Sequence, residues 1–175
     1  MVEPVSLALS FVGGIASHII AIYGYERAKH YKHRGNLKLE GTWAEKIERR
    51  ENSYSLCKIF YDVKKGMYAF DGTNYKNNGD INGHFSTVAS VLSDDKRRLF
   101  YIYEVEFLAD PGAQIHGLGI LNLHEQGGIV RPSDGHFNAG KPDKGEATPY
   151  SVYVTDLPYD RNAKGHKVIE FLKDK

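Results

Sequence analysis

The sequence has little of several features that define whole classes of protein. Among its 175 residues Cys57 is the only cysteine, so the chain cannot form a disulfide within itself, and a secreted domain held together by disulfides is excluded. The charges nearly cancel, with 23 Lys and Arg against 22 Asp and Glu. Surfaces that bind polymeric nucleic acid carry a clear basic excess, so we expect no such partner.

Signatures of common catalytic sites are also missing. The sequence contains no Walker loop, no Rossmann glycine fingerprint and no G-x-S-x-G nucleophile elbow. Of its scattered histidines, His116 and His124 would lie about 26 Å apart on a strand, too far to share a metal ion. The fold could bring His84, His116 and His136 together, but the sequence does not show this. We therefore predict no enzymatic activity, no cofactor and no metal site, with Cys57 as a small buried side chain.

One long hydrophobic run is present, and it lies at the N-terminus. Residues 4–24 read PVSLALSFVGGIASHIIAIYG, in which His18 is the only ionisable side chain. A helix of about 20 apolar residues spans a bilayer, and small residues of the kind found here let membrane helices pack closely. We therefore predict a transmembrane helix over residues 1–25, with a buried core helix or a signal peptide as the alternatives.

The charges around this run predict its orientation. Glu3 precedes the run, and basic residues follow it at Arg27, Lys29, Lys32 and Arg34. A signal peptide has the opposite arrangement, and the positive-inside rule places the basic side in the cytoplasm. We predict a single-pass membrane protein whose C-terminal domain is cytoplasmic, with residues 26–36 as a basic linker.

Beyond the linker, apolar and polar residues alternate as they do in half-buried strands. The clearest strand is 99–107, in which the odd-numbered residues are apolar or aromatic and face one way, whereas Glu104 and Glu106 face the other. Such carboxylates fit an outward, wet strand face better than a catalytic pair. Because closure removes exposed strand edges, the pattern predicts a mainly β fold over residues 37–175: an antiparallel lipocalin-like β-barrel of about eight strands.

The remaining segments have distinct compositions. Residues 134–149 are rich in Gly and Lys and are predicted to form a mobile loop. Gly117 and Gly119 fall within a predicted strand, where glycine indicates a bend or a close approach of neighbouring groups. Residues 164–173 are predicted to form a last short strand or helix.

Aromatic residues supply the candidate ligand site. A barrel of about eight strands has room inside for side chains or for one small ligand. Aromatic rings stack on nucleobases, and the planar guanidinium of arginine binds phosphate in a bidentate manner. The candidate ligand-binding residues are Trp43, Tyr68, Tyr75, Tyr101, Tyr103 and Arg131. The alternative is that these aromatic residues form the core and that Arg131 is a solvated surface charge.

Four short motifs follow one another along the barrel sequence. Residues 39–43 read LEGTW, a G-x-W of the kind that opens the first strand of lipocalin-like (calycin) barrels, and YAFDGTNY, HFST and LFYIYE follow at residues 68–75, 84–87 and 99–104. With the apolar run before them, these motifs resemble a family of bacterial anti-phage proteins. These are the STING-like, membrane-anchored, β-strand-rich effectors (the SMODS-associating transmembrane-β group) of cyclic-oligonucleotide systems.

The resemblance implies a function and a set of partners. In that family the barrel binds a cyclic dinucleotide, the ligand controls homo-oligomerisation, and the assembled transmembrane part disrupts the lipid of the bacterial inner membrane. The ligand either activates the effector or holds it silent, and a rim loop such as 134–149 would couple binding to assembly. The family typically has two transmembrane helices, whereas this chain shows one apolar run.

Three other functions remain open on the sequence. The first is a lipocalin-like carrier or sensor of a small apolar molecule, which would share the barrel and Trp43 but would not depend on Arg131. The second is a ligand-free structural or interaction barrel, whose interior would be filled completely by Tyr and Phe side chains. The third is an enzyme that uses the histidines, which a bound metal would reveal.

Overall fold

The structure is a computed structural model, and it describes residues 17, 20–32, 34–48, 53–110, 112, 114–139 and 147–175. The chain divides into two units, and each is described by itself. One unit comprises Met1–Gly35 with Val63–Gly66, and the other comprises Asn36–Asp62 with Met67–Lys175.

The first unit contains a helix over residues 20–32. Its side chains Ile20, Ile22, Tyr23 and Tyr25 are exposed. Among the described residues, no helix is both long enough and apolar enough to cross a membrane. Most of the apolar run for which a transmembrane helix is predicted lies outside the described residues, so that helix stays a prediction. The first part of the predicted basic linker, residues 26–32, belongs to this helix.

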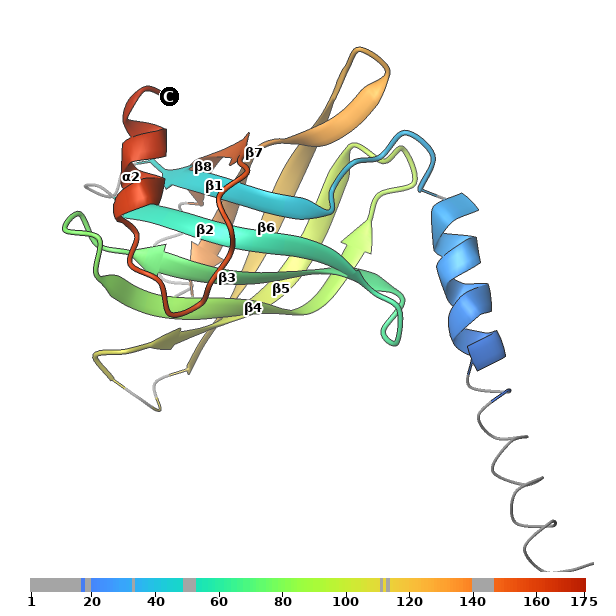
Figure 1. Cartoon of the computed structure of the whole chain (residues 1–175), viewed down its shortest axis with the longest axis horizontal. Helices are drawn as coiled ribbons and strands as arrows, with labels where there is room; N and C mark the ends of the chain where they lie inside the picture. The colour runs from blue at the N-terminus through green and yellow to red at the C-terminus, as the bar shows by residue number, and fades with distance from the viewer. Residues whose placement is uncertain are drawn as a thin grey trace, which may run out of the picture. The chain divides into compact units, whose positions relative to one another are not determined.

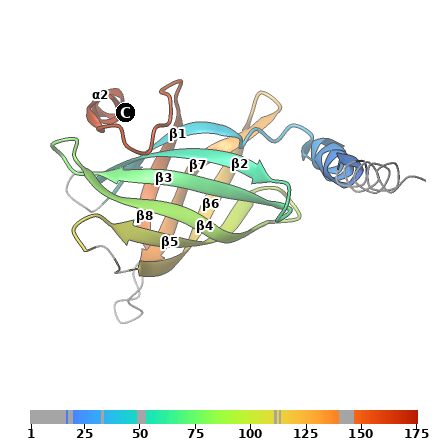
Figure 2. The same ribbon diagram turned by 60° about the horizontal axis from the view of Figure 1, so that its bottom comes forward.

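The second unit is a closed antiparallel β-barrel (Figures 1 and 2). Its strands are β1 (Gly41–Ile47), β2 (Ser53–Asp62), β3 (Met67–Tyr75), β4 (Ile81–Leu92), β5 (Arg98–Phe107), β6 (Gln114–Gln126), β7 (Ile129–Ala139) and β8 (Thr148–Val154). Each strand pairs with the next, and β1 also pairs with β8, so the sheet closes on itself. The predicted mainly β, antiparallel barrel of eight strands is thereby confirmed.

The barrel interior holds the main core, as the alternation of the sequence predicts. In β5 the side chains of Leu99, Tyr101, Tyr103 and Val105 face inward, whereas Glu104 faces outward. Cys57 is completely buried among the core side chains, which confirms its expected place.

One end of the barrel is filled by apolar side chains and is called the closed end. The segment before β1 crosses this end, where Leu37 forms a bridge with Val130 and both Leu37 and Leu39 are almost fully buried. The indole nitrogen of Trp43 donates a hydrogen bond of 2.8 Å to the carbonyl of Leu39, which ties this segment to the first strand. The G-x-W sequence therefore closes the barrel here.

A second, smaller core lies outside the barrel wall, beneath the C-terminal helix α2 (His166–Lys173) (Figures 1 and 2). Val168 and Leu172 of α2 pack with Ala44 of β1 and Leu56 of β2. These two strand residues alternate with inward-facing ones, so their outward side chains are buried only because the helix covers them. The last element, predicted as a strand or a helix, is thus a helix.

The predicted mobile loop over 134–149 is corrected by the structure. β7 continues to Ala139 and β8 begins at Thr148, and the two strands pair from Asp134 with Ser151 to Phe137 with Thr148. The small and polar residues here indicated a loop. In the structure the backbone groups of residues 134–137 are instead paired in the ladder between β7 and β8. Residues 140–146 lie outside the described residues.

Candidate ligand-binding cavity

A cavity of about 100 Å³ opens at the end of the barrel opposite the closed end. It lies where β1, β3, β5 and β7 finish and β2, β4, β6 and β8 begin, and this end is called the open end. Its lining includes Glu45, Ser53, Ser55, Asn74, Asn82, Phe70, Phe85, Tyr101, Tyr103, Phe137 and Tyr150. The cavity thus combines polar and aromatic side chains in an otherwise apolar interior.

The polar side chains form a row across three neighbouring strands. Glu45 on β1 pairs with Ser55 on β2, and Ser55 pairs with Asn74 on β3. The Ser55 hydroxyl donates a hydrogen bond of 2.7 Å to Oδ1 of Asn74, and the Cys57 thiol lies 3.5 Å from Oε1 of Glu45, to which it donates. We call Glu45, Ser55 and Asn74 the polar row. Asn74 keeps both amide hydrogens available, because its oxygen is the atom engaged here.

Glu45 dominates the electrostatics of the cavity. Burial raises its pKa from 4.5 to about 7, and the contacts with Cys57 and Ser55 oppose this rise. Its side chain lines the cavity, and the residue is only partly exposed. Among the described residues that line the cavity, Glu45 is the only one with a carboxyl, ammonium, guanidinium or imidazole group. Burial, followed by the charge of Glu45, raises the pKa of Cys57, so its thiol stays protonated as a donor.

Aromatic rings form the rest of the wall. In the eight-strand ring β6 lies opposite β2, so the rings on β5 and β7 face the polar row across the barrel. Tyr101 and Tyr103 lie 5.8 Å apart between ring centroids, Tyr103 lies 6.0 Å from Phe137, and Phe137 lies 6.0 Å from Tyr150. The hydroxyls of Tyr101 and Tyr150 share a hydrogen bond of 3.0 Å, and burial raises the pKa of both phenols. These rings form a contiguous aromatic wall.

Glycines on the inner face hold these rings flat against the barrel. Four rings each cover a glycine directly across the strand pair, where an added Cβ would overlap the ring: Phe85 over Gly72, Tyr103 over Gly117, Tyr101 over Gly119 and Tyr150 over Gly135. A ring that lies along the wall leaves the centre of the barrel open. The glycines therefore help to make the cavity, and the close approach predicted for Gly117 and Gly119 is confirmed.

The structure brings together some of the residues predicted as ligand-binding. Tyr101 and Tyr103 line the cavity, whereas Tyr75 touches it but packs in the second core beneath α2. Trp43 and Tyr68 are buried in the core and are not among the residues that line it. Arg131 is exposed on β7, next to Val130 at the closed end, and is not among them either.

Sequence reasoning missed the polar row. The signal was present, because Glu45 lies two residues from Trp43 and two from Ile47 on the same face of β1, which makes it a charged residue on an apolar stripe. Ser55 lies in the same way on the face of β2 that carries Cys57. Polar residues on an inward face indicate either a hydrogen-bonded core network or a ligand site.

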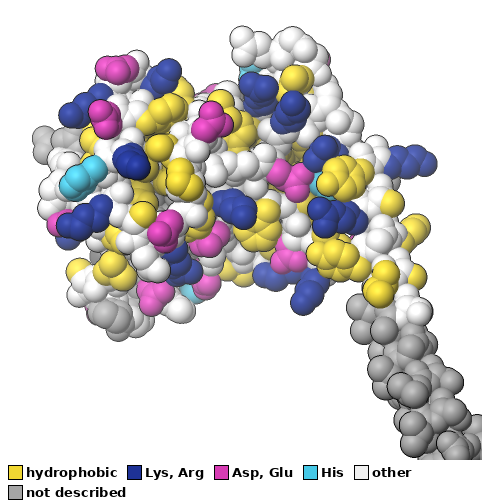
Figure 3. All heavy atoms as spheres, in the orientation of Figure 1, with side chains coloured by type: hydrophobic (Ala, Val, Ile, Leu, Met, Phe, Trp, Pro, Cys, Tyr) yellow, Lys and Arg dark blue, Asp and Glu magenta, His cyan; other side chains and the backbone are white. Residues whose placement is uncertain are grey.

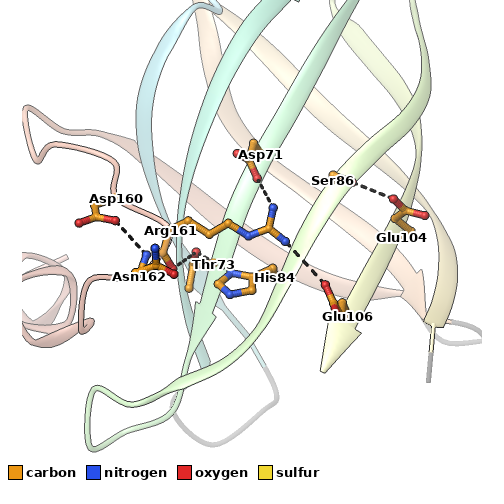
Figure 4. Close-up of polar contacts among 9 residues, drawn as sticks. All are labelled: Asp71, Thr73, His84, Ser86, Glu104, Glu106, Asp160, Arg161 and Asn162. Atoms are coloured by element: carbon orange, nitrogen blue, oxygen red, sulfur yellow. Dashed lines mark hydrogen bonds and ion pairs between the residues drawn. The ribbon is translucent and has the colours of Figure 1, made fainter. Parts of the chain in front are cut away.

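A second polar cluster lies outside the barrel, where the segment before α2 crosses β3, β4 and β5 (Figure 4). Arg161 of this segment reaches Asp71 on β3 at 3.9 Å and Glu106 on β5 at 3.7 Å. Beside it, Thr73 Oγ1 lies 3.1 Å from Nδ1 of the buried His84. These contacts attach the C-terminal segment to the wall, and nothing in them faces the cavity.

The histidines do not gather into a metal site within the described part of the chain. No group of three or more His, Cys, Asp or Glu side chains there could hold a metal ion. His84 is buried under the C-terminal segment, whereas His116 is exposed, 3.9 Å from Glu104 on the outer wall. Glu104 faces outward with Glu106, as predicted.

The outer surface and the comparisons with known proteins add little to the assignment. On the face that Figure 3 shows, Lys and Arg side chains are interspersed with Asp and Glu. No protein-family model matches the chain, and neither curated proteins nor solved structures gave a match. The function must therefore be argued from the cavity itself.

Proposed function

We propose that the barrel binds one small molecule at its open end, through a planar ring that carries hydrogen-bond donors. The observation that supports this most is the arrangement of the cavity, with the polar row on β1–β3 and the aromatic wall across from it. A ring held between these walls packs on the aromatic side chains and directs its polar edge at Glu45 and Asn74. Ligand sites commonly combine apolar walls with a few polar groups of this kind.

A nucleobase has the chemistry that this cavity selects. Stacking of a base on an aromatic side chain contributes about 1–3 kcal/mol. A carboxylate accepts hydrogen bonds from the N–H groups on the edge of a base, and the amide of Asn74 can donate or accept beside it. An apolar cavity of about 150 Å³ holds benzene, so this cavity of about 100 Å³ takes only the polar edge of one base and leaves the rest of the ligand at the mouth.

The family resemblance extends the proposal to a cyclic dinucleotide. One base inserts its polar edge into the cavity, and the second base and the two phosphates remain at the open end. On the same resemblance, the protein is a membrane-anchored anti-phage effector of the bacterial inner membrane, in which the bound nucleotide controls oligomerisation and membrane disruption. No catalytic role is proposed for it.

One observation favours a second candidate, a carrier or sensor of a small uncharged molecule. None of the described residues that line the cavity is Lys or Arg, so a doubly charged ligand gains no ion pair there. A nucleotide would have to keep its phosphates in solvent, where they stay hydrated and lose little binding free energy. An uncharged aromatic ligand needs no such arrangement, and its binding would be independent of salt.

Thermal unfolding of the full chain with cyclic di- and trinucleotides, free purine nucleosides and uncharged aromatic compounds tests both candidates. A ligand at a hundredfold excess over its dissociation constant stabilises the folded chain by about 2.7 kcal/mol, a shift of several degrees for a chain of this size. We expect one cyclic dinucleotide to give this shift and its parent nucleoside to give a smaller one.

Variants then connect the shift to the cavity. Tyr103→Leu removes an aromatic face, and Glu45→Gln exchanges the acceptor, so each should reduce the shift by at least half. The control for Tyr103→Leu is Phe60→Leu, which also replaces an aromatic ring by leucine but on the outer face of β2, and which should leave the shift intact. A shift with uncharged compounds alone supports the second candidate, and no shift with any of them overturns both.

A further inference from the structure

A band of exposed apolar side chains crosses the outer face of three neighbouring strands. Val91 on β4 pairs with Phe100 on β5, and Ile102 on β5 pairs with Leu118 on β6. The exposed fraction is 68% for Val91, 41% for Phe100, 41% for Ile102 and 62% for Leu118. We call these four residues, with Val88 in the bulge of β4, the outer apolar band. Within the described part of the barrel unit, α2 contacts β1 and β2 and leaves this band uncovered.

An apolar surface of this kind needs a partner that approaches the face of the sheet. Contiguous exposed apolar patches mark interaction sites, whereas scattered single side chains do not. The barrel is closed, so a partner cannot add a strand to an edge. A second copy can meet the band by face-to-face packing of two sheets, with their strands nearly aligned.

The charges that flank the band make it complementary to itself. The outward residues of β5 begin with Arg98, continue through Phe100 and Ile102, and end with Glu104 and Glu106. One end of the strand face is therefore basic and the other acidic. In a two-fold pair with antiparallel β5 strands, Phe100 of one copy faces Ile102 of the other, and Arg98 faces Glu104.

Glu104 is free to take part in this arrangement without losing its own contacts. It accepts a hydrogen bond of 3.1 Å from Ser86 through Oε1, and its other oxygen lies 3.9 Å from the exposed His116. A carboxylate has about four acceptor positions, so an arginine from a second copy adds to these contacts. Glu106 is already paired with Arg161 and is left out of the prediction.

We propose that the outer apolar band binds the same band of a second copy of this chain, in a two-fold pair with antiparallel β5 strands. The inference does not depend on the ligand proposed above, because the band lies on the outer wall. Five side chains cover less area than the roughly 800 Å² per partner of a standard stable interface. The pair is therefore weak, and its population depends on concentration.

Sedimentation velocity of the full chain over a hundredfold concentration range tests the pairing. The wild-type chain should sediment as a monomer at low concentration and as a dimer at high concentration. Ile102→Glu and Leu118→Glu should each remain monomeric, because pairing would bury a carboxylate without a partner in the interface. The matched control is Phe60→Glu, which places the same charge at an exposed aromatic position outside the band and should pair like the wild type. Thermal unfolding of each variant checks that the barrel is intact.

A charge exchange tests the orientation. Arg98→Glu and Glu104→Arg should each weaken pairing about tenfold, since a surface ion pair contributes up to about 1 kcal/mol and the two-fold pair contains it twice. The double variant should recover most of this loss.

A wild-type chain that stays single, or band variants that pair as well as the wild type, would overturn the proposal. A double variant no better than either single one would overturn the antiparallel arrangement. If pairing is unchanged but the band variants lose binding to vesicles of phosphatidylcholine and phosphatidylglycerol, the band belongs to a lipid surface instead.

Discussion

Glu45 is an ionisable residue that the barrel encloses, so its protonation is linked to folding. Its pKa is about 7 in the folded chain against an ordinary value of 4.5, chiefly because burial disfavours the charged carboxylate. Between these values the folded chain holds a proton that the unfolded chain has lost. The free energy of unfolding that Glu45 contributes therefore falls as the pH rises from about 4.5 to about 7, and it stays low at higher pH.

Glu45→Gln should remove this loss, because glutamine keeps the shape and some of the hydrogen bonding but cannot ionise. We compare the free energy of unfolding of the variant with that of the wild type. This difference should be about 1–3 kcal/mol more favourable to the variant at pH 8 than at pH 4. Thermal unfolding from pH 4 to pH 8 measures this gain. Glu170→Gln, the same change at an exposed position of α2, is the control. A difference between Glu45→Gln and the wild type that does not vary with pH would contradict the prediction.

The sequence predicts whether a single side chain points into or out of the barrel better than it predicts which side chains surround it. The inward direction of Tyr101 and Tyr103 follows from alternation along one strand, which is local information. The surroundings of Glu45 depend on Ser55 and Asn74, which come from two other strands and meet it only through the register of the sheet. The place of Arg131 at the closed end depends in the same way on strand direction around the whole barrel.

At the scale of elements, paired glycines and aromatic rings shape the interior. Gly119→Ala should push the Tyr101 ring off the wall and into the cavity, since the new Cβ would occupy the position of the ring. We expect a loss of about 1–3 kcal/mol in the free energy of unfolding and weaker binding of any ligand of the cavity. Thermal unfolding with and without that ligand measures both effects.

Gly24→Ala provides the control for this change. Gly24 lies in the N-terminal helix with no atom within 4 Å of an added Cβ. Alanine is the better helix former, so this variant should be equal to the wild type or more stable. If Gly119→Ala were as harmless as Gly24→Ala, the glycine would not be what holds the ring against the wall.

The strands themselves were largely predictable, and the exceptions have physical causes. Alternation of apolar and polar residues indicates a strand only where one face of the strand is apolar and the other polar. This holds for β5, but it fails in β7 from Ser133 onward, where Ser, Asp and Gly follow one another. In residues 164–173 the segment is so short that the spacing of its apolar residues does not distinguish a helix from a strand. The structure resolves it because α2 places Val168 and Leu172 on one side, over an outer face of the barrel.

At the scale of the whole molecule, closure of the barrel was predictable and the location of its cavity was not. Closure follows from strand number and from the cost of exposed edges. The cavity exists because one end is filled by Leu37 and Leu39 while rings lie flat along the wall at the other. Both facts depend on packing between strands distant in sequence.

Two buried groups with opposite linkage should flatten the pH dependence of the whole barrel. Burial, followed by the charge of Arg161, lowers the pKa of His84 below 6.5, and the nearby carboxylates of Glu106 and Asp71 oppose this only in part. The folded chain thus binds this proton less readily than the unfolded chain. The stability that His84 contributes is present above about pH 6.5 and is lost as the pH falls through its folded pKa, opposite in sign to Glu45.

Single variants should therefore expose the two slopes, each measured as a difference from the wild type. Between pH 5 and pH 6.5, Glu45→Gln should gain stability relative to the wild type as the pH rises, because the variant lacks the stability loss that ionisation of Glu45 causes in the wild type. His84→Asn, which keeps a polar group beside Thr73, should lose stability relative to the wild type over the same range, because the variant lacks the stability that the wild type gains as His84 loses its proton. Urea unfolding at half-unit intervals gives both slopes. Slopes of the same sign in the two variants would mean that His84 is charged in the folded barrel, and that the C-terminal segment is held there by an imidazolium rather than by a neutral ring.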